Sequence, residues 1–435
     1  MNKMKLGTCV SVTRGTTLSG EFYSEKGTNI RLTLGNFNYP GGGFKKNTSK
    51  KDIFFTGNVK DEFVLKKDDI ITPLTEQVSG LLGETAKIPE SNKYIQSGDI
   101  GLLKPDLTKI NPDFLYYLLP SKYVKNQLGS AAQQTKIRHT SPKKIMDCYV
   151  YLPDLDSQKK IGTFLAKIDL KIRNNSEQIK TLESLAKTIY DYWFVQFDFP
   201  NEDGKPYKSS GGKMVWNEEL KKEIPEKWIS SNIGSFVSEQ IRGDWGKESV
   251  EGNYTEKVVC IRGTDLSSLE SGLLSAPTRY ILKKNSGLKL KNGDVIVEIS
   301  GGSPTQSTGR ISYVNENTLK RGNCDLIASN FCKVLRLKSC SQLYFFYCFW
   351  NDIYSRGIFY RYEGKTTGIK NLMLDMFLDS FRLAIPSNID LFMKFDNIVS
   401  PMYEKIQKLN LESEKLHSIK YFLLSLLMNG QVTLQ

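Results

Sequence analysis

The hydrophobic pattern of the chain is dominated by one long helical stretch, residues 158–194. Its apolar positions alternate at steps of four and three residues, which is the heptad pattern of a coiled coil. At a rise of 1.5 Å per residue, a helix of this length spans about 55 Å. That is too long to be buried inside a single compact domain. Its apolar stripe therefore needs a partner. The core-type positions of this stripe, called the seam below, are Ile161, Leu165, Ile168, Ile172, Asn175, Ile179, Leu182, Ala186, Ile189 and Trp193.

A second stretch with the same alternating steps occupies residues 391–428. Ile161 corresponds to Phe395, and every later position keeps this register. Pro401 lies near the start, where it can kink a helix. The seam positions of this stretch are Phe395, Val399, Met402, Ile406, Leu409, Ser413, Leu416, Lys420, Leu423 and Leu427.

We expect the two stretches to pair with each other. Two similar halves related by a pseudo-two-fold axis favour an antiparallel pair, with one globule at each end. The polar seam residues Asn175, Ser413 and Lys420 are of the kind that sets register at some cost in stability. The alternative, in which each helix packs only on its own globule, stays open. Outward-facing side chains of the first helix, Tyr190 and Phe194 among them, are predicted to be docking positions for other subunits.

The remainder of the chain contains an internal repeat. KLGTCVSVTRG (5–15) is echoed by NIGSFVSEQIRG (232–243), and KKDDIITPLT (66–75) by KNGDVIVEIS (291–300). The period of roughly 230 residues is too long for a solenoid and indicates a duplicated domain. Within the first copy, a helix is predicted to start at Asn111, since Asn-Pro-Asp suits a helix cap and first turn.

These patterns predict an α+β protein with two similar mixed α/β, mostly β, domains joined by a pair of long antiparallel coiled-coil helices. The domains are assigned to residues 1–155 and 229–388, and the helices to 156–196 and 389–430. Residues 197–228 are rich in Gly, Pro, Ser and charged residues. That composition is typical of an inter-domain connector rather than a core element.

Composition narrows the choice of partner. The 435 residues carry 60 Lys plus Arg against 47 Asp plus Glu, a formal net charge of +13. This excess favours a polyanion, with nucleic acid ahead of an anionic membrane surface. We find no signal peptide, no stretch of eighteen apolar residues and no paired-cysteine motif among the seven cysteines. The expected location is therefore the cytoplasm, with no membrane partner.

Motifs for catalysis are missing from the sequence. It contains no phosphate-binding loop, no H-E-x-x-H motif and no C-x-x-C pair, and His139 and His417 are its only histidines. Asn111-Pro-Asp-Phe resembles part of the N-P-P-[FY] loop of adenine methyltransferases, but the second proline is missing and a helix start explains it better. We therefore predict no catalytic residue, no metal site and no cofactor.

Basic and amide side chains on loops suit DNA binding instead. Lysine and arginine contact phosphates, while Gln, Arg, Ser and Thr can read base edges in the major groove. Each cluster by itself is also compatible with a solvated surface, but the clusters lie at matching places in the two repeats. The candidate DNA-binding residues are Lys45, Lys46, Gln133, Gln134, Lys136, Arg138, Ser303, Gln306, Arg310, Arg361, Lys365 and Thr366.

The chain resembles the specificity subunits of type I restriction–modification systems. The resemblance spans nearly the whole length and is most specific in three parts. These are the entry LPDLDSQKKI (152–161), the exit DYWFVQFDFP (191–200), and Trp228 with the following Asn-Ile-Gly at the start of the second domain.

This resemblance implies a function. Such subunits carry two target recognition domains, each reading half of a split DNA sequence, held apart by a helical spacer. Methyltransferase subunits and a motor-nuclease subunit assemble on them, and the specificity subunit has no catalytic site. Two other classes remain open: a coiled-coil assembly protein, and a nucleic-acid enzyme with an unrecognised active site.

Overall fold

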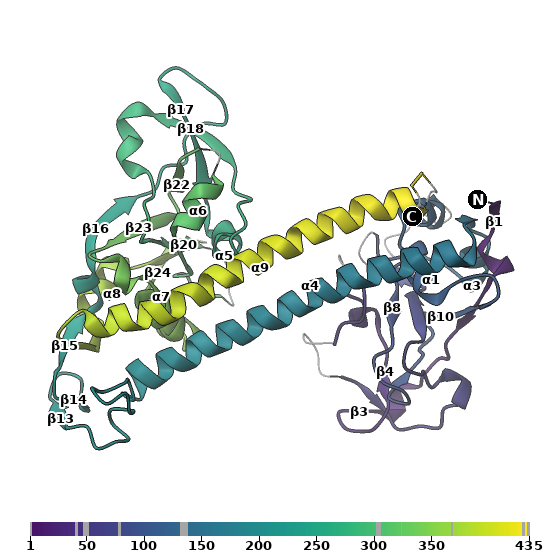
Figure 1. Cartoon of the computed structure of the whole chain (residues 1–435), viewed down its shortest axis with the longest axis horizontal. Helices are drawn as coiled ribbons and strands as arrows, with labels where there is room; N and C mark the ends of the chain where they lie inside the picture. Colours follow the sequence, from purple (N-terminus) through teal and green to yellow (C-terminus); the bar gives the residue numbers. More distant parts are fainter. Residues whose placement is uncertain are drawn as a thin grey trace. The chain divides into compact units, whose positions relative to one another are not determined.

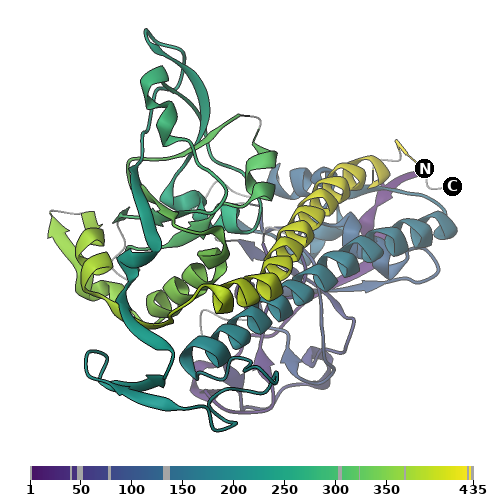
Figure 2. The same cartoon turned by 60° about the vertical axis from the view of Figure 1, so that its left-hand side comes forward.

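The computed structural model describes residues 2–39, 42–46, 52–76, 80–130, 138–301, 306–322, 324–366, 369–428 and 431–432. Two compact units make up the chain. Unit 1 contains residues 1–172 and 415–435, and unit 2 contains residues 173–414. Figures 1 and 2 show their elements, coloured along the chain.

Unit 1 is built on an antiparallel sheet with strand order β2-β10-β6-β8, formed by β2 (Val10–Arg14), β10 (Ile100–Pro105), β6 (Ile70–Pro73) and β8 (Ala86–Lys87). A smaller sheet has the order β3-β5-β4-β9, in which β4 and β9 are parallel. Its strands are β3 (Tyr23–Ser24), β5 (Phe54–Phe55), β4 (Ile30–Arg31) and β9 (Tyr94–Ile95). Two further pairs join β1 (Asn2–Lys5) to β12 (Tyr149–Leu152), and β7 (Thr75–Glu76) to β11 (Arg138–His139).

Three short helices, α1 (Pro112–Leu118), α2 (Lys122–Ser130) and α3 (Pro142–Met146), complete this domain. The predicted helix start is present, because the Asn111 side chain accepts a hydrogen bond from the backbone N–H of Phe114 at 3.0 Å. Pro112 occupies the first turn, where its missing N–H leaves no bond unmade. The apolar side of α1 then enters the core through Phe114, Leu115 and Leu118.

Unit 2 is built on a sheet with order β16-β23-β19-β21, formed by β16 (Val237–Arg242), β23 (Cys332–Leu337), β19 (Asp294–Glu298) and β21 (Ile311–Tyr313). A second sheet joins β18 (Thr278–Leu282), β17 (Tyr254–Ile261) and β22 (Leu326–Ala328), with β17 and β22 parallel. A third joins β20 (Ser300–Gly301), β25 (Ile369–Leu372) and β24 (Glu363–Thr366). The remaining pairs are β15 (Trp228–Asn232) with β26 (Arg382–Pro386), and β13 (Met214–Asn217) with β14 (Lys222–Pro225). Its short helices are α5 (Leu266–Glu270), α6 (Glu316–Arg321), α7 (Leu343–Ser355) and α8 (Leu374–Ser380).

The two units share local detail at matching sequence positions. The backbone N–H of Lys66 donates to Asp69 Oδ2 at 2.7 Å, and that of Lys291 donates to Asp294 Oδ2 at 2.7 Å. A left-handed residue precedes each aspartate, Asp68 in unit 1 and a glycine in unit 2. Each aspartate therefore closes the same turn into a buried central strand, β6 or β19.

Both predicted long helices are present as α4 (Leu155–Tyr190) and α9 (Asp390–Met428). A π-helical turn, Asp191–Val195, follows α4, and α9 continues through Pro401. All of the predicted seam positions are buried or half-buried. Within the described residues no helix is long and apolar enough to cross a membrane.

Within each unit, positions that advance along α4 meet positions that recede along α9. In unit 1, Ile161 and Leu165 share a core with Leu427 and Met428, and Asp169 pairs with Lys420 Nζ at 2.6 Å. In unit 2, Asn175 Nδ2 donates to Ser413 Oγ at 3.2 Å. Further along α4, the ring of Tyr190 meets that of Phe395 edge to face, with ring centroids 6.5 Å apart.

Two expectations from the sequence are corrected by the core of unit 2. Tyr190 and Phe194 are only 4% and 7% exposed, so they are core residues and not docking positions on an outward face. Phe194 packs against Phe345 and Phe392, with ring centroids 4.6 and 5.8 Å apart.

The second correction concerns residues 197–228, for which composition indicated a connector outside the core. Phe197 and Trp228 of this segment are buried in the same cluster, with ring centroids 5.1 Å apart. Ile224, on the β13–β14 hairpin, is also buried there. The polar residues that dominate the composition of this segment lie between the buried residues. The average composition therefore gave no sign of the buried residues.

Candidate nucleic-acid interface

In unit 1 the described candidate residues lie on two segments. Lys45 and Lys46 are exposed, and the backbone N–H of Lys45 donates to the carbonyl of Asn36 at 2.8 Å. Arg138 begins β11 and its Nη1 lies 3.5 Å from Glu76 Oε1 on β7. Gln133, Gln134 and Lys136 lie outside the described residues.

Glu76 gives Arg138 a structural partner as well as a surface position. Its carboxylate is buried and accepts backbone hydrogen bonds from Gly80 at 3.1 Å and Leu82 at 3.0 Å. A buried carboxylate needs such donors to offset its lost hydration. Arg138 therefore forms an ion pair with the carboxylate that holds the loop beside β7. The residue type alone did not indicate this structural role.

In unit 2 the candidate residues come from loops that are far apart in sequence but joined in the structure. Strand β20 pairs with β25, so the segment after β19 lies against the β24–β25 hairpin. The backbone N–H of Thr308 donates to Glu363 Oε1 at 2.7 Å, and Lys370 Nζ donates to the Gln306 carbonyl at 3.3 Å. These two bonds hold the segment that contains Gln306 against the hairpin.

The other candidates of unit 2 lie on or near this hairpin. Arg361 is exposed on the short helical turn that precedes β24. Lys365 and Thr366 belong to β24, but their side chains lie outside the described residues, as does the whole of Ser303. The backbone pairing of β20 with β25, and of β25 with β24, therefore brings together two candidate segments of unit 2 that the sequence did not connect.

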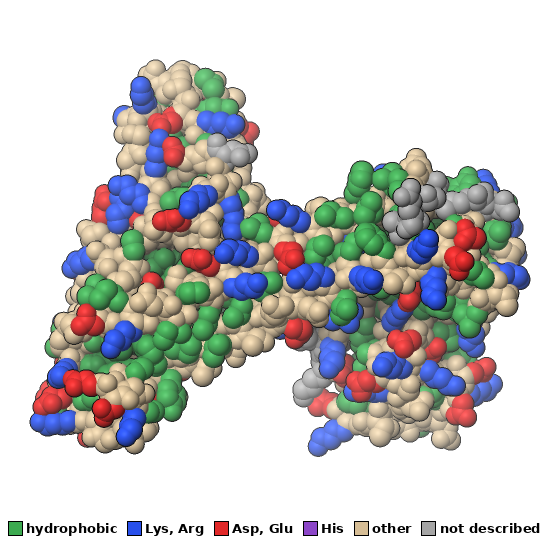
Figure 3. Space-filling view, viewed as in Figure 1, with side chains coloured by type: hydrophobic (Ala, Val, Ile, Leu, Met, Phe, Trp, Pro, Cys, Tyr) green, Lys and Arg blue, Asp and Glu red, His purple; other side chains and the backbone are tan. Residues whose placement is uncertain are grey.

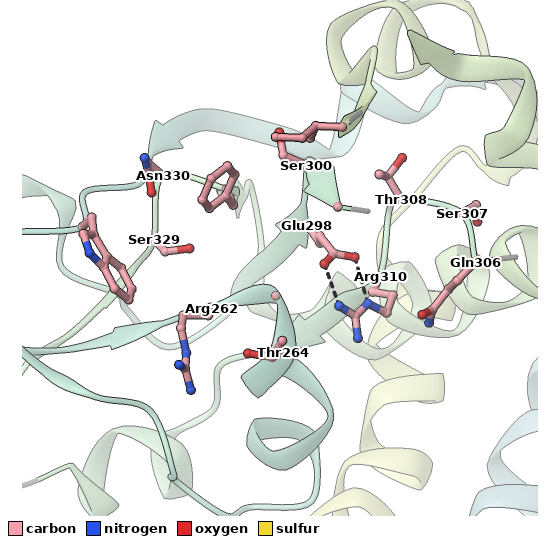
Figure 4. A pocket seen from close by; sticks show the side chains of 15 residues that line it. Arg262, Thr264, Glu298, Ser300, Gln306, Ser307, Thr308, Arg310, Ser329 and Asn330 are labelled. Carbon is pink, nitrogen blue, oxygen red and sulfur yellow. Dashed lines mark hydrogen bonds and ion pairs between the residues drawn. The ribbon is translucent and has the colours of Figure 1, made fainter. Parts of the chain in front are cut away.

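A cavity of about 640 Å³ opens beside this surface. Figure 4 shows polar side chains from four separate segments around it, with Glu298 and Arg310 joined across one side. Trp245, Phe331 and Ile369 add apolar walls, and Phe331 is half exposed. The remaining polar side chains at the cavity are Arg262, Thr264, Ser300, Gln306, Ser307, Thr308, Ser329 and Asn330.

Arg310 is held by a two-pronged ion pair. Its Nε donates to Glu298 Oε2 at 2.8 Å and its Nη2 donates to Glu298 Oε1 at 2.6 Å. These bonds to the buried carboxylate raise the pKa of Arg310. Gly263 permits the close packing, because a Cβ there would lie 2.3 Å from Glu298 Oε1.

Arg262 lies at the same cavity and was missed from the sequence. Its Nε and Nη2 donate to the two carboxylate oxygens of Asp265, both at 2.8 Å. Burial opposes ionisation of Asp265, but the bonds from the Arg262 side chain and backbone outweigh it and lower the pKa of this carboxyl. The sequence carries no signal for Arg262, whose counterpart in unit 1, Thr33, is identified only by the strand pairing.

Charged side chains of both signs lie on the surface. Figure 3 shows lysine and arginine side chains spread among acidic ones on the visible face, with no single basic patch. No group of three or more His, Cys, Asp or Glu side chains suited to a metal ion occurs within the described ranges.

Comparison with known proteins gives the family. Residues 2–184 match the sequence family described as the type I restriction modification DNA specificity domain. These residues belong to that family. The resemblance of the chain to type I specificity subunits is confirmed.

Relatives of this specificity domain extend the match along the chain. The MjaIX specificity subunit of a type I restriction enzyme from Methanocaldococcus jannaschii is 23% identical over 334 residues, which cover 74% of this chain and 69% of that protein. The HindI specificity subunit from Haemophilus influenzae is 28% identical over 111 residues, which cover 25% of this chain and 24% of that protein.

A solved structure shares the fold at low sequence identity. The S subunit of a type I restriction–modification system from M. genitalium has a TM-score of 0.61 and 15% identity, and covers 98% of this chain and 96% of its own. This likeness concerns the fold, which in the present chain is a mixture of helix and sheet with a long helix.

Proposed function

We propose that this chain is the sequence-specific DNA-binding subunit of a type I restriction–modification complex and recognises a bipartite DNA target. The observation that carries the proposal is the shared strand order of the two sheets, β2-β10-β6-β8 and β16-β23-β19-β21. Each sheet is accompanied by a short strand pair that carries candidate residues, Arg138 in β7–β11 and Lys365 and Thr366 in β24–β25. Two such domains in one chain suit two half-sites.

In this proposal residues 1–155 and 229–388 are the two target recognition domains. Helices α4 and α9 form an antiparallel coiled-coil spacer between them. The opposite running of α4 and α9 positions within each unit supports this arrangement. At 1.5 Å per residue, the 36 residues of α4 span about 54 Å, which is more than one turn of DNA at roughly 34 Å.

The candidate residues divide between phosphate contacts and base contacts. Exposed Lys45, Lys46 and Arg361 suit phosphates, because ammonium and guanidinium groups bind them without regard to sequence. Gln306, which lines the cavity beside Arg310, suits a base edge. Gln133, Gln134, Lys136, Ser303, Lys365 and Thr366 are assigned to the same interface from their sequence positions.

Methyltransferase and motor-nuclease subunits are the proposed protein partners, in the cytoplasm. Support comes from the names of the relatives, which are specificity subunits of type I restriction enzymes. The proposed role of this chain is to direct those subunits to a target, with the reaction itself carried out by them.

The test is methylation mapping in cells with and without this chain. A methylated motif of two short half-sites separated by a fixed gap should disappear when the gene is deleted. A second strain, in which residues 5–150 are exchanged for those of another specificity subunit, should change one half-site only. A change in both half-sites, or an unaltered motif in the deletion strain, would exclude the proposal.

A further inference from the structure

A turn that follows a buried strand is built in the same way in both units. In unit 1 the backbone N–H of Thr33 donates to Asn36 Oδ1 at 2.8 Å. In unit 2 the backbone N–H of Arg262 donates to Asp265 Oδ2 at 2.9 Å. A short 3-10 helix follows Thr33 and Arg262 in their respective units.

The strands before these turns show that the two positions correspond. Ile30 and Arg31 pair in parallel with Tyr94 and Ile95, and the aligned pairs in unit 2 are Val259 with Leu326 and Cys260 with Ile327. Counting forward from either strand by the same number of residues leads to Thr33 and to Arg262. The backbone is therefore conserved between the two copies while the side chain at this place differs.

The Arg262 side chain is not needed for the turn itself. Its backbone N–H makes the capping bond, and Thr33 makes the equivalent bond with a much smaller side chain. The Arg262 side chain is among those that line the cavity (Figure 4), and it keeps 43% of its surface exposed. Two recognition domains with the same backbone can differ in specificity when a single position carries different side chains.

Asp265 orients the guanidinium and leaves one edge of it open. The bonds to Asp265 use Nε–H and one N–H of Nη2, which together form one side of the planar fork. The other N–H of Nη2 and the N–H groups of Nη1 lie on the end of the fork. Within the described residues, Asp265 is the partner to which the Arg262 side chain donates.

An end-on arginine fork matches one base better than the others. Guanine presents two adjacent acceptors, O6 and N7, in the major groove, and arginine binds both at once. Adenine presents a donor beside N7, so it repels one prong. From this geometry we infer that Arg262 is a specificity-determining residue that reads a guanine in the half-site bound by unit 2, with Asp265 as its positioning residue. The inference rests on the proposed function.

Arg310 lies at the same cavity in the same type of arrangement, since its Nε and Nη2 are both bound to Glu298. Its side chain is 30% exposed, less than that of Arg262, and its carboxylate partner is on the central sheet. Arg262 is on a turn outside that sheet, which makes it the better placed of the two to reach a base edge.

The experiment selects DNA from a random duplex library with the purified full-length chain and sequences what is retained. Arg262→Thr installs the side chain that the equivalent turn of unit 1 carries, so the turn is preserved. Arg262→Lys keeps the charge and loses the fork. Asp265→Asn copies Asn36, retaining an acceptor for the capping bond while weakening the hold on the guanidinium. Arg382→Ala is the matched control, because Arg382 also pairs with an acid, Glu219 at 3.1 Å, but does not line the cavity.

Arg262→Thr and Arg262→Lys should each lose preference for guanine at one position of one half-site, by about 10- to 100-fold, and leave the other half-site unchanged. Asp265→Asn should weaken the same preference to a smaller degree, and Arg382→Ala should select the wild-type motif. Equal melting temperatures would show that the variants fold. The inference is overturned if Arg262→Thr selects the wild-type motif, or if the affected position is not a guanine. If the wild-type chain selects no motif, the proposed function itself fails.

Discussion

Asn175 on α4 donates a hydrogen bond to Ser413 on α9 across 238 residues of sequence, with Nδ2 and Oγ 3.2 Å apart. Asn175 is fully buried and also donates to Glu412 Oε2 at 2.9 Å, while its own Oδ1 lacks a partner among the described atoms. An unpaired buried oxygen costs stability. Asn175→Leu should therefore raise the free energy of unfolding by about 1–2 kcal/mol, measured by urea denaturation.

Asn175→Ala is the control for this prediction. It removes the same polar atoms but fills no space, so the cavity it leaves should make it less stable than Asn175→Leu. Ser413 stays satisfied in both variants, because its Oγ donates to the Leu409 carbonyl at 2.8 Å. A loss of stability in Asn175→Leu would mean that the amide contributes more than its unpaired oxygen costs.

Glu270 predicts a pH dependence of the stability of unit 2. Burial, and then the nearby charge of Glu183, raise its pKa to about 7. The folded state therefore holds a proton that the unfolded state releases near pH 4.5, so stability falls as pH rises from about 4.5 to about 7 and is level above that. Glu270→Gln removes this loss and should be more stable than wild type at pH 8 by about 3 kcal/mol.

At pH 4 to 5 the two proteins should have nearly equal stability, because both then carry a neutral side chain at this position. Gln can still accept the hydrogen bond that the Tyr347 hydroxyl donates to Glu270. Denaturation midpoints at several pH values give the difference between the variants, which cancels titration elsewhere. A difference that does not change with pH would contradict the prediction.

The proposed spacer predicts a relation between helix length and target gap. Removing one heptad from α4 and the facing heptad from α9 shortens each helix by about 10 Å and keeps the apolar stripe in phase. The gap between half-sites should shrink by about three base pairs, since each base pair adds about 3.4 Å. Methylation mapping measures the gap directly, and an unchanged gap would exclude a measuring role for the helices.

Arg361 predicts a change in salt dependence. If this exposed side chain contacts one phosphate, Arg361→Ala should weaken binding to all sequences equally and lower the slope of log affinity against log salt by about 0.9. Fluorescence anisotropy at several salt concentrations gives the slope. An altered sequence preference with an unchanged slope would place Arg361 on a base instead.

The two long helices and the start of α1 could be predicted from the sequence because their signals are local. The seam of α4 and α9 follows from spacing alone, and the α1 start follows from Asn111 and Pro112. Residues whose role depends on contacts with distant parts of the chain could not be identified from local sequence. Arg138 and Arg310 have the right residue type for DNA, but their pairing with buried Glu76 and Glu298 depends on strand register.

Packing between distant segments also explains the correction at Tyr190 and Phe194. Tyr190 and Phe194 are compatible with an outward helix face until α7 supplies Phe345 to cover them. Arg262 was missed because a single arginine after a buried strand carries no signal. Its significance appears only when the turn is compared with that of Thr33 and Asn36.

Unit 1 is made of two segments from opposite ends of the chain, so it cannot be completed until synthesis is nearly finished. Its core includes Leu427 and Met428 of α9, which the ribosome makes after the whole of unit 2. Unit 2 is one continuous segment and has all of its residues earlier. Until α9 has been synthesised, Ile161 and Leu165 lack these partners. The first domain must therefore stay unaggregated and able to fold until then. A nascent chain stopped near residue 414 would be a substrate for chaperones or proteases at its older end.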